Sequence, residues 1–370
     1  MRVGINATCF NERPSGARHR FITLYGAVFR SLADLEFVIY EPSDCRLSQW
    51  FPDLQNLTYR KTNIPSTGGM RKNLASFSYW SERSRDEKFD VFEVMHLPLL
   101  YTGQSPILLT IHDIRALTTP RGLAQFLFAG KVGKHALERS KHVLTVSHAM
   151  RSEMLGIYPD LNISVIYNGV NIEKYKNINF ENARKRIQKY KLNRKYILSV
   201  GHLEARKNYA TLLKAIALLK SRGEDVFLVI VGNDSGEGRA IHELIFRLKL
   251  DNNVKVFSGI CEEDLISFYF LCELFIFPST YEGFGIPLIE AMAAKKPTVV
   301  SDIPVFREIT EGKSFFFQPE SEEDIANTIL RALSSSEERT KVVEHGSQRV
   351  SAFSVDRLAL QLSDIYVQGF

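Results

Sequence analysis

Several familiar signatures are missing from this sequence of 370 residues, and each absence excludes a class of protein. The four cysteines, Cys9, Cys45, Cys261 and Cys272, form no C-x-x-C pair, so we expect reduced thiols in a cytosolic protein and no zinc site. No apolar run approaches the length of a membrane span. The opening residues, MRVGINATCF, lack the apolar region of a signal peptide. We therefore expect a first strand there and a cytoplasmic protein.

Motifs for bound nucleotides and metals are absent as well. Gly312-Lys-Ser lacks the upstream glycine of a P-loop, and Gly236-Glu-Gly238 lacks the third glycine of a dinucleotide fingerprint. The sequence contains neither H-E-x-x-H nor a D-x-D triplet that would hold a nucleotide-bound divalent ion. We expect no metal site and no bound cofactor.

The net charge of +5 is distributed unevenly. Up to Ile172 there are 20 Lys and Arg against 15 Asp and Glu, which leaves 47 − 20 = 27 against 42 − 15 = 27 in the remainder. An excess in the first half could serve an anionic acceptor or a peripheral contact with the inner face of a membrane. A solvated surface is the other interpretation.

Apolar strand patterns alternate with helical patterns in both halves, which is typical of parallel sheets covered on both faces. In the first half the expected strands are 2–7, 36–40, 91–95, 107–111, 142–146 and 163–166, with helices at 17–33, 123–138 and 149–156. In the second half the expected strands are 196–200, 227–231, 254–257, 274–277, 298–301 and 315–317, with helices at 209–221, 238–248, 262–271, 286–294 and 322–333.

A chain of this length usually forms more than one domain. The pattern predicts two Rossmann-like α/β domains that face a central cleft, and the charged stretch 173–195 contains their connection. We place the first domain at 1–172 and the second at 173–352.

The stretch STYEGFGIPLIEAM, residues 279–292, carries the strongest chemical signal. It follows a buried strand, and a helix is predicted from Ile286 because Pro287 suits a first helical turn. Gly283, Phe284 and Gly285 precede that helix, so their backbone N–H groups are open to an anionic ligand. The carboxylates Glu282 and Glu290 flank the loop, although Glu290 could simply complement the helix dipole.

A second loop supplies cations. The strand 196–200 ends in Gly201, and Arg206 and Lys207 follow shortly before the next helix, which Asn208 is expected to cap. Ligands of open α/β sheets bind at this edge, and an Arg–Lys pair there would neutralise a diphosphate. A solvated pair is the alternative.

In the first half, polar residues follow three strands. His112 and Asp113 come after the strand 107–111, where they could bind sugar hydroxyls or cap the next segment. Gly16 lies in a loop before a helix, either approaching a ligand or forming a turn. His96 and Ser147 follow two other strands, with acceptor binding or capping as their alternatives.

The 282–290 string resembles the E-x7-E signature of retaining glycosyltransferase family four, whose members have the GT-B fold. Gly201 to Asn208 resembles the family's G-x-x-x-x-(R/K)-K-N segment, and His112-Asp113 its His-Asp pair. The Gly16 loop is poorer in glycine than the family pattern, and Asn171 replaces an acid in N-G-V-D. The resemblance also implies that a final helix in 353–370 crosses back to the first domain.

The resemblance implies a retaining, metal-independent transfer of a hexose from a nucleotide-diphosphate sugar. The frequency of donors in the family suggests GDP-mannose as the donor. It likewise suggests, as the acceptor, a glycan or a lipid-linked saccharide of surface polysaccharide (lipopolysaccharide) synthesis. The resemblance assigns catalysis to His112, Glu282, Arg206 and Lys207. It assigns donor binding to Gly16, Asp113, Gly201, Gly283, Phe284, Gly285, Ile286 and Glu290, and we expect His96 and Ser147 to contact the acceptor. A GT-B nucleotide-sugar 2-epimerase and a non-catalytic nucleotide-sugar-binding regulator are the alternatives.

Overall fold

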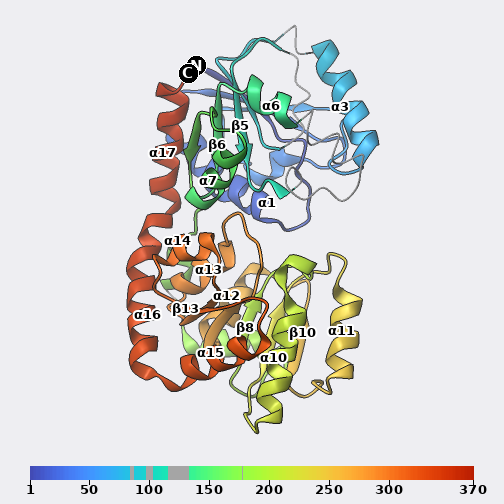
Figure 1. The fold of residues 1–370 in the computed structure, drawn as a ribbon. Helices are drawn as coiled ribbons and strands as arrows, with labels where there is room; N and C mark the ends of the chain where they lie inside the picture. The colour runs from blue at the N-terminus through green and yellow to red at the C-terminus, as the bar shows by residue number, and fades with distance from the viewer. Residues whose placement is uncertain (84–86, 97–102, 116–132, 177) are drawn as a thin grey trace. The chain divides into compact units, whose positions relative to one another are not determined.

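The computed structural model describes residues 1–83, 87–96, 103–115, 133–176 and 178–370. Their contacts divide the chain into two units (Figure 1): unit 1 comprises Met1–Gly169 with Val355–Phe370, and unit 2 comprises Val170–Ser354. The divisions after residues 172 and 352 expected from the sequence lie within three residues of these boundaries.

Unit 1 is built on a seven-stranded parallel sheet with the order β3-β2-β1-β4-β5-β6-β7. Its strands are β1 Arg2–Asn6, β2 Glu36–Glu41, β3 Leu57–Lys61, β4 Val91–Val94, β5 Ile107–Ile111, β6 His142–Thr145 and β7 Ile163–Val165. The central strand pairs on both edges, with Val3 opposite Phe37 of β2 and Val91 of β4. β1, β4 and β5 are almost wholly buried, which explains their near-continuous apolar sequences.

The helices of unit 1 are α1 Gly16–Arg20, α2 Gly26–Ser31, α3 Gly69–Arg83, α6 Lys134–Arg139, α7 His148–Ile157 and α17 Val355–Gln368, with a π-helical segment at Phe21–Tyr25 and a 3-10 turn at Leu47–Trp50. The π segment joins α1 to α2, so the expected helix 17–33 is present with one irregular turn. α17 belongs to the core of this unit through Leu358, Leu362 and Tyr366.

Unit 2 has a six-stranded parallel sheet with the order β10-β9-β8-β11-β12-β13. Its strands are β8 Ile197–Val200, β9 Leu228–Val231, β10 Val254–Phe257, β11 Leu274–Phe277, β12 Thr298–Ser301 and β13 Phe315–Phe317. Its helices are α8 Glu173–Lys176, α9 Phe180–Ile187, α10 Tyr209–Ser221, α11 Gly238–Arg247, α12 Glu262–Leu271, α13 Ile286–Ala293, α14 Pro304–Thr310, α15 Glu322–Ser334 and α16 Ser336–Arg349, with 3-10 turns at Gln188–Tyr190, Ala205–Lys207 and Val350–Phe353.

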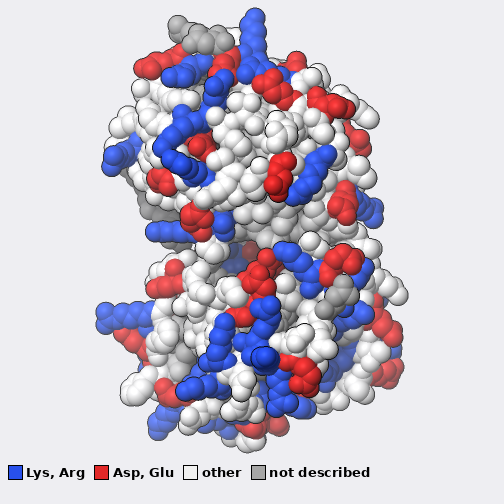
Figure 2. Space-filling model, turned by 180° about the vertical axis from the view of Figure 1, so that it is seen from behind, with Lys and Arg blue, Asp and Glu red and all other residues white. Residues whose placement is uncertain are grey.

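Two elements of unit 1 were missed by the sequence analysis, namely the edge strand β3 and the helix α3. Most of the expected helix 123–138 falls outside the described residues, and its described end belongs to α6. The charge excess of the first half does not form a separate patch on the face in Figure 2, where cationic and anionic side chains are interspersed. No helix among the described residues is long and apolar enough to cross a membrane.

Candidate active site

The order of the strands in unit 2 identifies one sheet edge as the place for a ligand. From β8 the chain continues through β9 to β10 on one side, whereas β11, β12 and β13 lie on the other side of β8. The carboxyl ends of β8 and β11 therefore form the topological switch point, where open α/β sheets bind ligands. β8 leads into Gly201–Asn208, and β11 leads into the loop before α13.

Three charged side chains from these two loops meet in a compact cluster. Lys207 Nζ lies 2.6 Å from Glu282 Oε1, and Arg206 Nη1 lies 2.5 Å from Glu282 Oε2. Arg206 Nη2 also lies 2.6 Å from Glu204 Oε1. The Lys207 and Glu282 side chains are only 7% and 8% exposed, so water screens their ion pair weakly. We call Arg206, Lys207 and Glu282 the charge cluster.

Backbone and hydroxyl groups hold the charge cluster in place. Arg206 Nη1 donates to the Tyr281 carbonyl at 3.2 Å, and the Thr280 amide donates to the Arg206 carbonyl at 2.9 Å. The fully buried Ser279 donates its hydroxyl to Glu282 Oε1 at 2.8 Å. The two loops are thus joined before any ligand arrives.

The charge cluster fixes the ionisation of Glu282. Burial alone would raise the pKa of this carboxyl, but Lys207 and Arg206 overcome that effect and hold the pKa at about 2. Burial lowers the pKa of Lys207, and Glu282 opposes that change. Glu282 is therefore an anion at every physiological pH and accepts hydrogen bonds only.

Glycine is required at two positions beside the charge cluster. A Cβ on Gly201 would lie 3.0 Å from Lys207 Cε, so the lysine packs against a bare backbone. Gly285 caps α13 with φ of 116°, and a Cβ there would lie 3.0 Å from Phe306 Cε1. Gly283, Phe284 and Ile286 surround this helix start, where the dipole of α13 favours negative charge. Phe284 itself is buried against Phe353.

Glu290 lies in the same helix in a different environment. Tyr269 Oη donates to its Oε2 at 2.9 Å, and the Tyr175 hydroxyl also hydrogen-bonds to it. Burial is the main reason that the pKa of Glu290 rises to about 7, and the nearby Glu262 adds to the rise. Glu290 therefore gains or loses its proton at a much higher pH than an ordinary glutamate.

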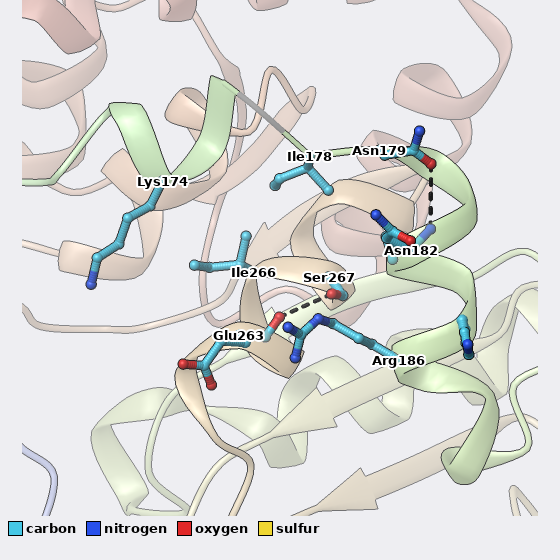
Figure 3. A pocket seen from close by; sticks show the side chains of 10 residues that line it. Lys174, Ile178, Asn179, Asn182, Arg186, Glu263, Ile266 and Ser267 are labelled. Atoms are coloured by element: carbon cyan, nitrogen blue, oxygen red, sulfur yellow. Dashed lines mark hydrogen bonds between the residues drawn. The ribbon is translucent and has the colours of Figure 1, made fainter.

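A hollow of about 500 Å³ lies in unit 2 apart from the charge cluster. Figure 3 shows Lys174 of α8, Asn179 at the N-cap of α9, Arg186 within α9, and Glu263 and Ile266 of α12 around it. It contains none of the site residues expected from the sequence. Its α8 and α12 walls nevertheless supply the two tyrosines that hold Glu290.

In unit 1, His112 and Asp113 follow β5 as expected. Burial, with a smaller contribution from Arg20, lowers the pKa of His112 to about 3, so its imidazole is neutral. Asp113 Oδ2 lies 3.1 Å from Arg115 Nη2 and its Oδ1 accepts from the Arg115 amide. The aspartate thus shapes the loop that follows β5.

The other three expected residues of unit 1 differ in what they offer a ligand. His96 follows β4, at the switch point with β1, and burial lowers its pKa to about 3. Ser147 is fully buried and its Oγ accepts from the Met150 amide at 3.1 Å, which is the capping role. Gly16 begins α1 without a positive φ. An acceptor contact by Ser147 or a ligand contact by Gly16 stays a prediction.

The predicted cap at Asn208 is wrong, and several partners of the site residues were not predicted. Asn208 precedes α10 in a left-handed conformation without capping it, because its Oδ1 accepts from Thr211 Oγ1 and its Nδ2 donates to the Pro319 carbonyl. Tyr175 and Tyr269 were missed because each comes from a distant helix. Ser279 and Glu204 were detectable in principle, since each lies within three residues of the charge cluster.

Comparisons with known proteins agree with this architecture. Residues 180–349 match the family model described as glycosyl transferases group 1, and residues 36–174 match the model of glycosyltransferase family 4. The O-antigen chain mannosyltransferase RfbU of Salmonella typhimurium is 31% identical over 60% of this chain and 59% of its own length. The O-antigen chain mannosyltransferase B of Escherichia coli is 27% identical over 70% of this chain and 69% of its own length. The crystal structure of Anabaena Alr3699/HepE in complex with UDP and glucose superposes with a TM-score of 0.79 at 19% identity, over the full length of both chains.

Two parallel-sheet α/β units of this kind define the GT-B class of fold. Because the two family models together match most of residues 36–349, the chain belongs to glycosyltransferase family 4, a family of enzymes. The aligned region spans 59% of the RfbU protein, so that relative extends beyond what is compared.

Proposed function

We propose that the protein is a retaining glycosyltransferase that moves a hexose from a nucleotide-diphosphate sugar to a glycan or lipid-linked saccharide in surface polysaccharide synthesis. The charge cluster at the switch point of unit 2 is the observation that carries this proposal. Mannose, from GDP-mannose, is our choice of hexose because two relatives are named O-antigen chain mannosyltransferases.

In this proposal the charge cluster exchanges partners when the donor binds. Glu282 neutralises Arg206 and Lys207 in the free protein, and the donor diphosphate takes over part of that role. Negative charge grows on the diphosphate as the glycosidic bond breaks, so the two cations stabilise the transition state more than the ground state. Since these cations neutralise the leaving group, the transfer needs no metal ion.

Glu282 is freed in part by that exchange and accepts hydrogen bonds from the donor sugar. The amides of Gly283 to Ile286 add donors, and Glu290 binds the ribose hydroxyls. Retention proceeds by attack of the acceptor on the face that the diphosphate leaves.

Unit 1 supplies the remaining groups. Neutral His112 can both donate and accept a hydrogen bond, which suits a sugar hydroxyl, and Asp113 fixes its loop. His96 and Ser147 contact the acceptor, and Gly16 binds the donor. A lipid-linked acceptor implies that unit 1 contacts the inner face of a membrane as a peripheral protein.

A ligand panel followed by a transfer assay tests the proposal. We expect one of the UDP-, GDP-, ADP- and dTDP-sugars, GDP-mannose first, to raise the unfolding temperature of the purified protein, because a ligand that binds only the native state stabilises it. Lys207→Met should lower kcat by roughly 100-fold or more, since it removes a preorganised charge from the leaving group. The exposed Lys214, paired loosely with Glu322 at 3.9 Å, provides the control Lys214→Met.

Two results would contradict the proposal. One is transfer that proceeds equally well in Lys207→Met and Lys214→Met. The other is conversion of the donor to its epimer when no acceptor is present, which would make the protein a 2-epimerase.

A further inference from the structure

The helix α3 presents an apolar stripe to solvent. Met70, Leu74 and Phe77 are 80%, 65% and 58% exposed, and their spacing places them on one side of the helix. Other large exposed apolar residues among the described parts of the chain, such as Phe246, do not form such a stripe. Figure 1 shows α3 at the periphery of unit 1.

Contacts on the remaining sides of α3 fix this orientation. Trp80 is buried with its ring centroid 4.9 Å from that of Tyr40 and 5.3 Å from that of Phe92. Near the start of the helix, Lys72 Nζ donates to the Ser66 carbonyl at 2.8 Å and to the Thr8 carbonyl at 3.3 Å. The helix cannot turn its stripe inward without giving up a buried indole and an anchored ammonium.

Cations predominate around the start of the stripe, and the acidic Glu82 lies at the other end of α3. Between Asp53 and Glu82 the chain contains no Asp or Glu, whereas Arg60, Lys61, Arg71 and Lys72 lie in that interval. Arg60, Lys61 and Arg71 are exposed, at the end of β3 and in the first turn of α3. Arg60 Nε lies 4.0 Å from Glu87 Oε1, whereas Lys61 and Arg71 form no ion pair with any residue that the structure describes. The structure thus combines exposed Met, Leu and Phe side chains with exposed cations, the composition of helices that lie in a membrane interface.

We propose that α3 is the membrane-docking element of this protein, with the stripe inserted among the acyl chains of an anionic bilayer surface and the cations among its headgroups. This inference deepens the proposed function, because it rests on the proposed membrane contact and names its surface. A second copy of the chain fits the stripe less well. Stable protein interfaces use about 20–30 residues on each side, and three apolar side chains fall far short of that.

Vesicle sedimentation tests the proposal. The full-length protein should bind vesicles of phosphatidylcholine with phosphatidylglycerol more tightly than vesicles of phosphatidylcholine alone. The triple variant Met70→Ser/Leu74→Ser/Phe77→Ser should lose on the order of tenfold in affinity, because three apolar side chains no longer enter the interface. Phe246→Ser removes a side chain that is 76% exposed on α11 of unit 2 and serves as the matched control with unchanged binding.

A second variant separates the charge from the apolar contribution. Arg60→Gln/Lys61→Gln/Arg71→Gln should abolish the preference for phosphatidylglycerol, and added salt should have the same effect on the wild type. Transfer to a water-soluble saccharide should be unchanged in both triple variants. If the wild-type protein binds vesicles but shows no transferase activity, the proposed function is contradicted and this inference still holds. Equal vesicle binding by the wild type and the serine variant would overturn the inference. Concentration-dependent dimers that the serine variant abolishes would also overturn it.

Discussion

Glu282 and Glu290 belong to the same short segment, yet their environments move the two pKa values in opposite directions. Lys207 and Arg206 hold the pKa of Glu282 at about 2, whereas burial raises the pKa of Glu290 to about 7 although two tyrosine hydroxyls act to lower it. Neighbouring carboxyls kept in different protonation states are suited to different tasks. The permanently ionised Glu282 lies beside cations that a diphosphate can bind. Glu290, which can be neutralised, is suited to hydrogen bonds with hydroxyl groups.

The ion pair of Lys207 and Glu282 should show strong energetic coupling. Glu282→Gln leaves two cations without their buried partner, so we expect a loss of about 3 kcal/mol in the free energy of unfolding. Lys207→Met should lower the free energy of unfolding much less in the Glu282→Gln variant than in the wild type. Urea unfolding of the wild type, both single variants and the double variant gives the coupling energy.

An exposed pair of similar geometry provides the control for this cycle. Lys341 Nζ lies 2.5 Å from Glu337 Oε1, but the two side chains are 70% and 80% exposed. Water and salt screen that pair, so its coupling should be close to the error of the measurement. Equal coupling in both pairs would contradict the burial argument.

Glu290 should make stability depend on pH. The folded protein binds the Glu290 proton more tightly than the unfolded chain, so this contribution is fully present below pH 4.5 and is lost as pH rises through about 7. Tyr269 and Tyr175 donate to the carboxyl, Glu262 raises its pKa and Lys174 lowers it. Glu290→Gln should therefore gain roughly 2 kcal/mol relative to the wild type between pH 5 and pH 8. Urea unfolding of both proteins at the two pH values measures this, and parallel pH profiles would show that Glu290 titrates normally.

At the scale of the element, the start of α13 depends on a glycine. Gly285 has a φ of 116°, and a Cβ there would meet the buried Phe306 ring at 3.0 Å. Gly285→Ala should cost about 1–3 kcal/mol and raise the KM for the donor, because the loop that holds Glu282 must shift. Gly156 in α7 has open space around its Cβ position, so Gly156→Ala should be neutral or stabilising. Thermal unfolding and donor titration of both variants test this, and equal effects would refute the strain argument.

The same scale shows what the sequence could and could not predict. Both parallel sheets were predictable, because strands such as β5, β8 and β11 are near-continuous apolar runs between recognisable turns. β3, with the sequence LTYRK, was missed because an edge strand that is half-exposed needs no apolar alternation. α3 was missed because apolar residues on two opposite faces hide the helical period.

The sequence predicted which residues belong to the candidate site better than it predicted the contacts between them. Arg206, Lys207 and Glu282 follow strands that are neighbours only in the folded sheet, so their pairing depends on the strand order. The tyrosines on Glu290 come from α8 and α12, and no local pattern connects them with α13. The elevated pKa of Glu290 therefore could not be inferred from the sequence.

At the scale of the whole molecule, the two units differ in how the chain builds them. Unit 2 is one continuous segment, whereas unit 1 is completed by α17 from the end of the chain. Leu358, Leu362 and Tyr366 are buried in the unit 1 core, and Tyr366 donates its hydroxyl to the buried Glu93, which also accepts from Tyr25. A fragment of residues 1–169 would expose that core and leave Glu93 short of a donor.

We therefore expect three fragments to behave differently. Residues 170–354 should fold alone and be stabilised by the donor nucleotide, because the charge cluster and Glu290 with its tyrosines all lie within them. Residues 1–169 should show no cooperative thermal transition. Fusing residues 355–370 to residues 1–169 through a short Gly-Ser linker should restore a cooperative transition. The linker can be short because a Cβ on Gly169 would lie only 3.2 Å from Val355 Cα, so the two chain ends are adjacent. Circular dichroism with thermal unfolding distinguishes the three. A fully folded 1–169 fragment would mean that α17 is dispensable, and a fused fragment that stays unfolded would mean that unit 1 needs more of the chain than its own core.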